Sequence, residues 1–196
     1  MARYLADQTL HDVLSAFSAP IPTPGGGSAC AAASAIGVAL LMKAASVAAL
    51  PQHTLAGIEA QLTDAIDDDA AAYKDVLAAR KQPRDSQAES ALRTAAIQRA
   101  LRYATDVPLT IMRLSVEALT EVRLLAPRIH RSTVADVVVA VTLLRAGFEG
   151  ARTTVAANLG GLEDASHAAR VRDECSGLSE RAAQDSSEAE RLLRVG

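Results

Sequence analysis

The chain has 196 residues, of which 49% are hydrophobic, 3% are aromatic and 22% are charged, and its formal net charge is −3. Its length and apolar content predict one domain, 1–196, with a substantial buried core. The 20 basic residues are mixed with 23 acidic ones, so we expect no DNA or RNA partner. The first residues lack the apolar core and cleavage site of a secretory signal, which favours a cytoplasmic protein.

Metal and redox sites are not indicated by the sequence. Cys30 and Cys175 are far apart and match no metal-binding or redox spacing, so both are expected to be reduced thiols. The four histidines form no local cluster with the spacing of metal ligands. We therefore predict a protein without a bound metal.

Apolar residues recur every three or four positions through nearly the whole chain, apart from a short valine run at 137–141. This periodicity predicts an all-α fold, a single helical bundle of about six to seven helices. The first predicted helix ends near Pro20. Its inner face is expected to consist of Leu10, Val13, Leu14 and Phe17.

Residues 22–28, PTPGGGS, form the most distinctive local feature, and some twenty small or apolar residues follow them. The prolines restrict the backbone and the three glycines have no β-carbon, so backbone N–H groups can approach a neighbour or a ligand closely. Ser28 is predicted to cap the next helix. The alternative is a tight loop whose glycines serve only packing.

The helix predicted over residues 29–50 is mostly alanine, with Ser34 and Gly37. Because it carries little bulk on any face, other helices can pack closely around it, and we expect it at the centre of the bundle. It is also the one stretch long enough to cross a membrane. It contains Lys43 and lacks the leucine and isoleucine density that favours insertion, so we expect no membrane span.

After Pro51 a long helix is predicted to run to about Arg80, and it contains Asp67, Asp68 and Asp69. Each step along a helix turns the side chain by about 100°, so the three carboxylates cannot all face water. The buried stripe is expected to consist of Leu62, Ala65, Ile66, Ala72, Tyr73 and Val76. Asp69 falls on this stripe. A carboxylate there must accept hydrogen bonds, pair with a cation or have a raised pKa, and each of these is also what a catalytic acid or base needs. A structural ion pair with a buried arginine is the alternative.

The second half of the chain is predicted to contain a surface loop at 81–86 and a helix over 88–105 that meets Pro108, which is expected to kink or divide it. A further helix is expected over 133–158, and a polar outer helix over 164–194.

Three polar residues in this half have competing interpretations. Asp136 either belongs to a capping-box-like start with Thr133 or points inward. Asp106, beside Pro108, is either a ligand group or a cap, and Asn158 is placed to act as a C-terminal cap.

Several short motifs occur in a familiar order: PTPGGGS at 22–28, DAAAY at 69–73, ATDVPL at 104–109, and AD at 135–136 followed by VA at 139–140. In these motifs the chain resembles the cyclodeaminase/cyclohydrolase family, from about residue 20 to 164. That family includes the C-terminal domain of formiminotransferase-cyclodeaminase and free-standing bacterial methenyltetrahydrofolate cyclohydrolases. The resemblance implies an all-α homodimer that binds a folate substrate and needs no cofactor beyond that tetrahydrofolate. The implied catalytic residues are Asp69 and Asp136, and the implied substrate-binding residues are Pro24, Gly25, Gly26, Gly27, Ser28 and Asn158.

The expected reaction is hydrolysis of 5,10-methenyltetrahydrofolate to 10-formyltetrahydrofolate. Its substrate carries a cationic bridge, for which Asp69 would be both an electrostatic partner and the base that activates water. Asp136 would orient the bridge or carry a proton. The backbone amides of residues 22–28, the glycine loop, would hold a carbonyl or a carboxylate of the folate, and basic side chains would bind its glutamate tail.

Two alternatives remain open. One is cyclodeamination of formiminotetrahydrofolate with release of ammonia. The other is a noncatalytic folate-binding or structural helical dimer, which three departures from the family pattern favour. Thr154 and His130 stand where asparagines are usual, and 48–53 lacks the family's basic stretch.

Overall fold

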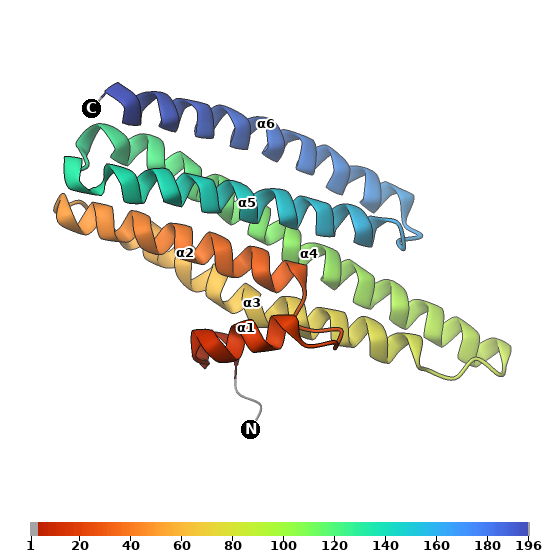
Figure 1. The fold of residues 1–196 in the computed structure, drawn as a ribbon. Helices are drawn as coiled ribbons and strands as arrows, with labels where there is room; N and C mark the ends of the chain where they lie inside the picture. Colours follow the sequence, from red (N-terminus) through yellow and green to blue (C-terminus); the bar gives the residue numbers. More distant parts are fainter. Residues whose placement is uncertain (1–3, 196) are drawn as a thin grey trace.

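The computed structural model describes residues 4–195, and every regular element in that range is helical (Figure 1). The helices are α1 (Leu10–Ser18), α2 (Gly26–Val47), α3 (His53–Arg80), α4 (Gln87–Leu125), α5 (Val134–Leu159) and α6 (Ala165–Val195). Three short 3-10 segments, η1 (Leu5–Asp7), η2 (Ala126–Arg128) and η3 (Arg131–Thr133), lie between or before them. The all-α prediction is confirmed, and the valine run at 137–141 lies inside α5.

Helices α2 to α6 form one elongated bundle, with α2 packed against α3, α4 and α5 (Figure 1). The small residues of α2 allow this close packing. A β-carbon on Gly37 would lie 3.1 Å from the carbonyl oxygen of Ala140, so the backbones of α2 and α5 approach each other directly. The hydroxyls of Ser34 and Ser115 join α2 to α4 through a buried hydrogen bond of 2.9 Å. The predicted central position of the alanine-rich helix is confirmed.

By length and composition, α2 is the helix of residues 4–195 that could span a membrane, and 44% of its most apolar window is buried in the bundle.

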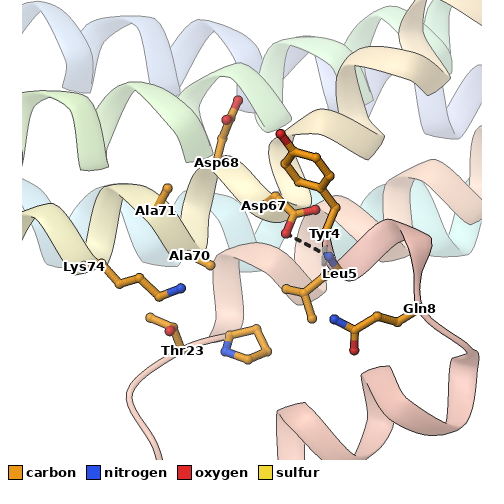
Figure 2. A pocket seen from close by; sticks show the side chains of 10 residues that line it. Tyr4, Leu5, Gln8, Thr23, Asp67, Asp68, Ala70, Ala71 and Lys74 are labelled. Atoms are coloured by element: carbon orange, nitrogen blue, oxygen red, sulfur yellow. Dashed lines mark hydrogen bonds between the residues drawn. The ribbon is translucent and has the colours of Figure 1, made fainter. Parts of the chain in front are cut away.

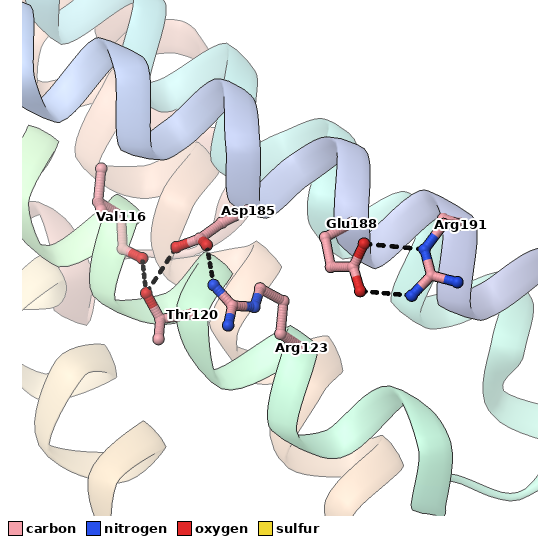
Figure 3. Close-up of polar contacts among 6 residues, drawn as sticks. All are labelled: Val116, Thr120, Arg123, Asp185, Glu188 and Arg191. Carbon is pink, nitrogen blue, oxygen red and sulfur yellow. Dashed lines mark hydrogen bonds and ion pairs between the residues drawn. The ribbon is translucent and has the colours of Figure 1, made fainter.

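The buried carboxylate of Asp185 on the polar outer helix α6 forms hydrogen bonds to α4 (Figure 3). Asp185 accepts hydrogen bonds from the Thr120 hydroxyl at 2.7 Å and from the Arg123 guanidinium at 2.6 Å. Glu188 and Arg191 form a further pair along the exposed side of α6. Because the Asp185 side chain is only 6% exposed, these two partners are what offset its loss of hydration.

The predicted inner face of the first helix is wrong. None of the residues of α1 is buried, and Leu10 and Leu14 are 71% and 59% exposed. Figure 1 shows α1 beside the bundle rather than within it. The apolar spacing correctly indicated an amphipathic helix, but periodicity cannot say whether the rest of the same chain covers its apolar side.

The sequence predicts that Pro108 kinks or divides its helix. Helix α4 runs unbroken through Pro108, so the division is wrong, whereas a kink stays a prediction. Proline has no N–H, and the carbonyl of Ala104, four residues earlier, therefore loses its helical partner. Asn158 on α5 replaces that partner, because its Nδ2 donates to the Ala104 oxygen at 2.6 Å. A contact from another helix thus lets α4 continue to Leu125.

Candidate active site

The glycine loop leads into α2 differently from the prediction. Gly25 is the N-cap residue and α2 begins at Gly26, so Ser28 does not cap the helix, and that prediction is wrong. Ser28 is instead the third helical residue and is fully buried. Its hydroxyl donates to the carbonyl oxygen of Ile66 on α3 at 2.7 Å, which ties the start of α2 to α3.

Asp69, on α3, satisfies a backbone amide at the start of α2. The first turn of any helix has N–H groups without an internal partner. Ser28 donates one of them to Asp69 Oδ2 at 2.9 Å, and its hydroxyl oxygen lies 3.2 Å from the same carboxylate oxygen. A carboxylate in this place is also favoured by the positive end of the helix dipole.

Burial raises the pKa of Asp69 above its ordinary value of 3.8, and the Ser28 amide and hydroxyl beside the carboxylate offset part of that rise. The alternative of a buried arginine partner is not found: no ion pair in residues 4–195 includes Asp69. The result is a half-buried carboxylate that holds its proton more tightly than a surface aspartate does.

Gly25, Gly26 and Gly27 differ in how closely the rest of the protein approaches them. A β-carbon on Gly27 would collide with Asp69 Oδ1, so only glycine allows this contact. A β-carbon on Gly26 would meet no atom within 4 Å. Within the described chain, the amides of Gly26 and Gly27 have no protein acceptor. Both therefore remain available, beside Asp69, for a carbonyl or carboxylate oxygen of a ligand.

These groups surround one open cavity of about 290 Å³. It is lined by Pro22, Thr23, Gly25, Gly26, Gly27, Asp69, Tyr73, Ala104, Thr154 and Asn158. Of the predicted site residues, the structure thus brings together Gly25, Gly26, Gly27, Asp69 and Asn158. Ser28 lies behind this wall as the residue that positions Asp69, and Pro24 lines a neighbouring cavity instead.

Tyr73 is a cavity residue that the sequence reasoning missed. It was expected on the buried stripe, but its side chain is 41% exposed and lines the cavity one helical turn after Asp69. The spacing of four residues places both on one face of α3 and was the available signal. Tyr73 supplies an aromatic wall next to the carboxylate.

Two α5 residues form the opposite wall. The Thr154 hydroxyl donates to the Gly150 carbonyl of its own helix at 3.1 Å. Asn158 does not cap the end of α5, as the sequence had indicated, because its amide nitrogen bonds to Ala104. That bond turns the carboxamide toward α4 at the edge of the cavity.

The structure does not bring Asp136 to this cavity. Its carboxylate pairs with the Lys43 ammonium at 2.8 Å, and the two side chains are 30% and 61% exposed. The capping-box alternative is not formed either, since Thr133 makes no side-chain cap and its hydroxyl donates to the His130 carbonyl at 2.8 Å. A role for Asp136 at Asp69 stays a prediction.

Asp106, the potential metal ligands and the two cysteines do not form a second site with Asp69 in residues 4–195. Asp106 lies within α4 and lines a separate hollow of about 250 Å³ with Asp64 and Asp68. In the described part of the chain no three histidine, cysteine or acidic side chains are placed to hold a metal ion. Cys30 and Cys175 are both free thiols, as predicted.

A second cavity, of about 480 Å³, lies beside the start of the glycine loop, at Thr23 and Pro24 (Figure 2). It is lined by Tyr4, Leu5, Gln8, Thr23, Pro24, Asp67, Asp68, Ala70, Ala71 and Lys74. Asp67 is already engaged there, because its Oδ1 accepts the Leu5 amide at 2.9 Å. Thr23 lines both cavities.

A helical bundle with a half-buried carboxylate, free helix-terminal amides and an aromatic wall around one cavity has the site of a small-molecule enzyme rather than of a structural bundle. The profile of the formiminotransferase-cyclodeaminase family matches residues 9–177. The chain belongs to that family, as its motifs predicted.

Individual relatives agree with this assignment. A methenyltetrahydrofolate cyclohydrolase from Methylorubrum extorquens is 33% identical over 185 residues, which cover 88% of this chain and 89% of the relative. A formimidoyltransferase-cyclodeaminase from Rattus norvegicus is 30% identical over 193 residues, and the match covers 91% of this chain but only 35% of that longer protein. The crystal structure of a formiminotetrahydrofolate cyclodeaminase from Thermotoga maritima has the same fold, with a TM-score of 0.85, 20% identity and coverage of 95% and 96% of the two chains.

Proposed function

We propose that this protein is an enzyme that hydrolyses 5,10-methenyltetrahydrofolate to 10-formyltetrahydrofolate. The observation that carries the proposal is the half-buried Asp69, held by Ser28 beside a cavity that also contains two free backbone amides. The 33% identity to the Methylorubrum extorquens cyclohydrolase, over 88% of this chain, supports water as the co-substrate.

The chemistry follows from the two oxygens of Asp69. Oδ2 is held by the Ser28 amide, whereas Oδ1 has no hydrogen-bond donor among residues 4–195. Oδ1 accepts a proton from water while the water oxygen attacks the carbon of the cationic N5–CH–N10 bridge. The raised pKa of Asp69 then allows the protonated carboxyl to return that proton to N5 as the C–N5 bond breaks. The formyl group stays on N10, and one proton is released to solvent.

The cavity wall would orient the substrate. The Gly26 and Gly27 amides can hold a carbonyl or carboxylate oxygen, and Tyr73 offers its ring to the flat bicyclic system. The reaction exchanges no electrons, so it requires no redox cofactor, and we propose that it needs none besides the tetrahydrofolate itself. Asp136, predicted as a second catalytic residue, would have to be reached by movement or through a second copy of the chain. We place the enzyme in the cytoplasm, where folate one-carbon transfers would supply its substrate.

Cyclodeamination of formiminotetrahydrofolate is the second candidate function. It is favoured by the fold shared with the Thermotoga maritima protein and by a carboxyl group that can hold a proton for a departing amine. The same site would serve both reactions, because each passes through a tetrahedral carbon bonded to both N5 and N10.

The test is the loss of methenyltetrahydrofolate absorbance with purified protein, against spontaneous hydrolysis in buffer. Asp69→Asn should lower kcat by about 10²- to 10⁴-fold, the usual contribution of a general base. Asp75→Asn is the matched control, because it makes the same change on α3 outside both cavities. Equal rates for wild type and Asp69→Asn would refute the role of Asp69. Ammonia release from formiminotetrahydrofolate, without loss of the methenyl absorbance, would support the second candidate.

We also infer that the protein forms a homodimer. Ile36 and Val47 on α2, and Val139 on α5, are 54%, 52% and 49% exposed on helices that pack together. Apolar side chains gathered on one surface commonly mark a protein–protein contact. Sedimentation equilibrium of the wild type and of Ile36→Glu would test this, with dissociation expected in the variant.

A further inference from the structure

Two cavities meet at Thr23 and open on different faces of the same stretch of α3. Asp69 and Tyr73 line the smaller one, whereas Ala70, Ala71 and Lys74 line the larger one. Thr23 is common to both and stands at the boundary between them. The five residues from Asp69 to Lys74 amount to about 7.5 Å along α3 and about 140° around it, so the two side chains leave the helix on different faces. Because Thr23 lines both cavities, a long ligand with its reactive end at Asp69 would pass over Thr23 to enter the larger cavity.

Lys74 is the one basic side chain lining either cavity, and it takes part in no ion pair or hydrogen bond of the described chain. In Figure 2 its ammonium points inward, toward Thr23 and Ala70. Lys43, by contrast, is paired with Asp136. An unpaired cation facing a cavity is placed to bind an anionic group of a ligand.

The acidic residues of the larger cavity do not neutralise Lys74. Asp67 Oδ1 accepts the Leu5 amide at 2.9 Å, and Oδ2 lies 3.5 Å from the Ala6 amide. Asp68 carries its carboxylate away from Lys74, on the far side of α3 from Thr23 (Figure 2). The lining also includes apolar surface from Tyr4 and Leu5, against which an aromatic ring can pack.

We propose that the larger cavity receives the p-aminobenzoyl-glutamate tail of the folate and that Lys74 binds a carboxylate of that tail, an inference that rests on the proposed function. A folate is a flat reactive ring joined through an aryl group to one or more glutamates. The parts of the folate and the surfaces of the protein follow the same order. The reactive ring would lie at the Asp69 carboxylate and the Gly26 and Gly27 amides, and the tail would pass Thr23 to the apolar side chains and the Lys74 ammonium. Lys74 is accordingly a specificity-determining residue for the tail and takes no part in the reaction at the bridge.

The test compares three substrates that share the methenyl bridge: a tail-free pterin, the monoglutamate and the triglutamate. Lys74→Gln should raise KM for the monoglutamate about three- to fivefold, as loss of one exposed ion pair predicts. The rise should be larger for the triglutamate and absent for the tail-free pterin, with kcat unchanged throughout. Lys74→Arg should keep most of the affinity, and high salt should reduce the difference between wild type and Lys74→Gln.

Lys81→Gln is the matched control, since it removes a lysine at the end of α3 that lines neither cavity. Equal KM values for wild type and Lys74→Gln with all three substrates would overturn the proposal, and so would an equal rise for the tail-free pterin. If the wild type hydrolyses none of the three substrates, calorimetric titration with tetrahydrofolate mono- and triglutamate measures the affinity of wild type and Lys74→Gln for the tail directly. Weaker tail-dependent binding by Lys74→Gln would then support the tail site while the hydrolysis proposal fails, and absence of folate binding would overturn both.

Discussion

Replacement of Gly27 by alanine should separate Asp69 from the start of α2. A β-carbon at this position would collide with Asp69 Oδ1, so the carboxylate must turn away and lose the 2.9 Å bond from the Ser28 amide. A hydrogen bond to a charged group contributes about 1.5–3 kcal/mol. Alanine offsets up to about 1 kcal/mol of that loss through its higher helix propensity. The net loss in the free energy of unfolding is about 0.5–3 kcal/mol, or about 1–12 °C in Tm for a chain of this size.

The assay is thermal and urea unfolding followed by circular dichroism, together with the hydrolysis rate. Gly57→Ala is the control, because a β-carbon there meets no atom within 4 Å on an α3 position outside the site. It should leave the rate unchanged and leave Tm equal or higher. The collision disappears when Asp69 is also truncated, so the loss caused by Gly27→Ala should shrink in an Asp69→Ala background. The reasoning is refuted if Gly27→Ala is as stable and as active as Gly57→Ala.

Two further predictions concern the residues that support the site. Asn158→Ala leaves the Ala104 carbonyl without its partner, so urea unfolding should show a loss of about 1–3 kcal/mol. In a Pro108→Ala background the restored helical N–H can bond to Ala104, and an undiminished loss there would contradict this account. For pH dependence, the active form of Asp69 is the carboxylate, and its pKa is raised above 3.8, so kcat/KM should increase with pH through a midpoint above that value. Ser28→Ala removes the hydroxyl that helps to lower the pKa of Asp69 and keeps the amide bond, so the midpoint should move further up, and a downward shift would count against the assignment.

The same raised pKa has a consequence for stability. A carboxyl group that binds its proton more tightly in the folded chain than in the unfolded one favours the fold at low pH. Stability contributed by Asp69 is therefore present below 3.8 and is lost as the pH rises through the native pKa. In Asp69→Asn this pH-dependent loss should be absent, as measured by urea unfolding on both sides of that range.

Much of the fold could be predicted because helix formation depends on local spacing. The long helix that ends at Arg80 and the stop after Asn158 are both observed, since apolar periodicity and glycine signals act within a few residues. The exposure of Leu10 and Leu14 could not be predicted, because it depends on which distant surface, if any, covers α1. The continuity of α4 through Pro108 depended on Asn158, a residue fifty positions away in the chain.

For the site, the sequence by itself determined the chemical groups: a glycine loop that can approach a neighbour closely, and an aspartate that helix geometry directs inward. Only the tertiary structure decided their relation. Asp69 bonds to the Ser28 amide because α2 and α3 pack side by side, whereas Asp136 is held by Lys43 outside the same cavity. Local sequence sets the face of a helix on which a side chain lies, but its partner is set by the packing of helices, which depends on contacts between residues far apart in the chain.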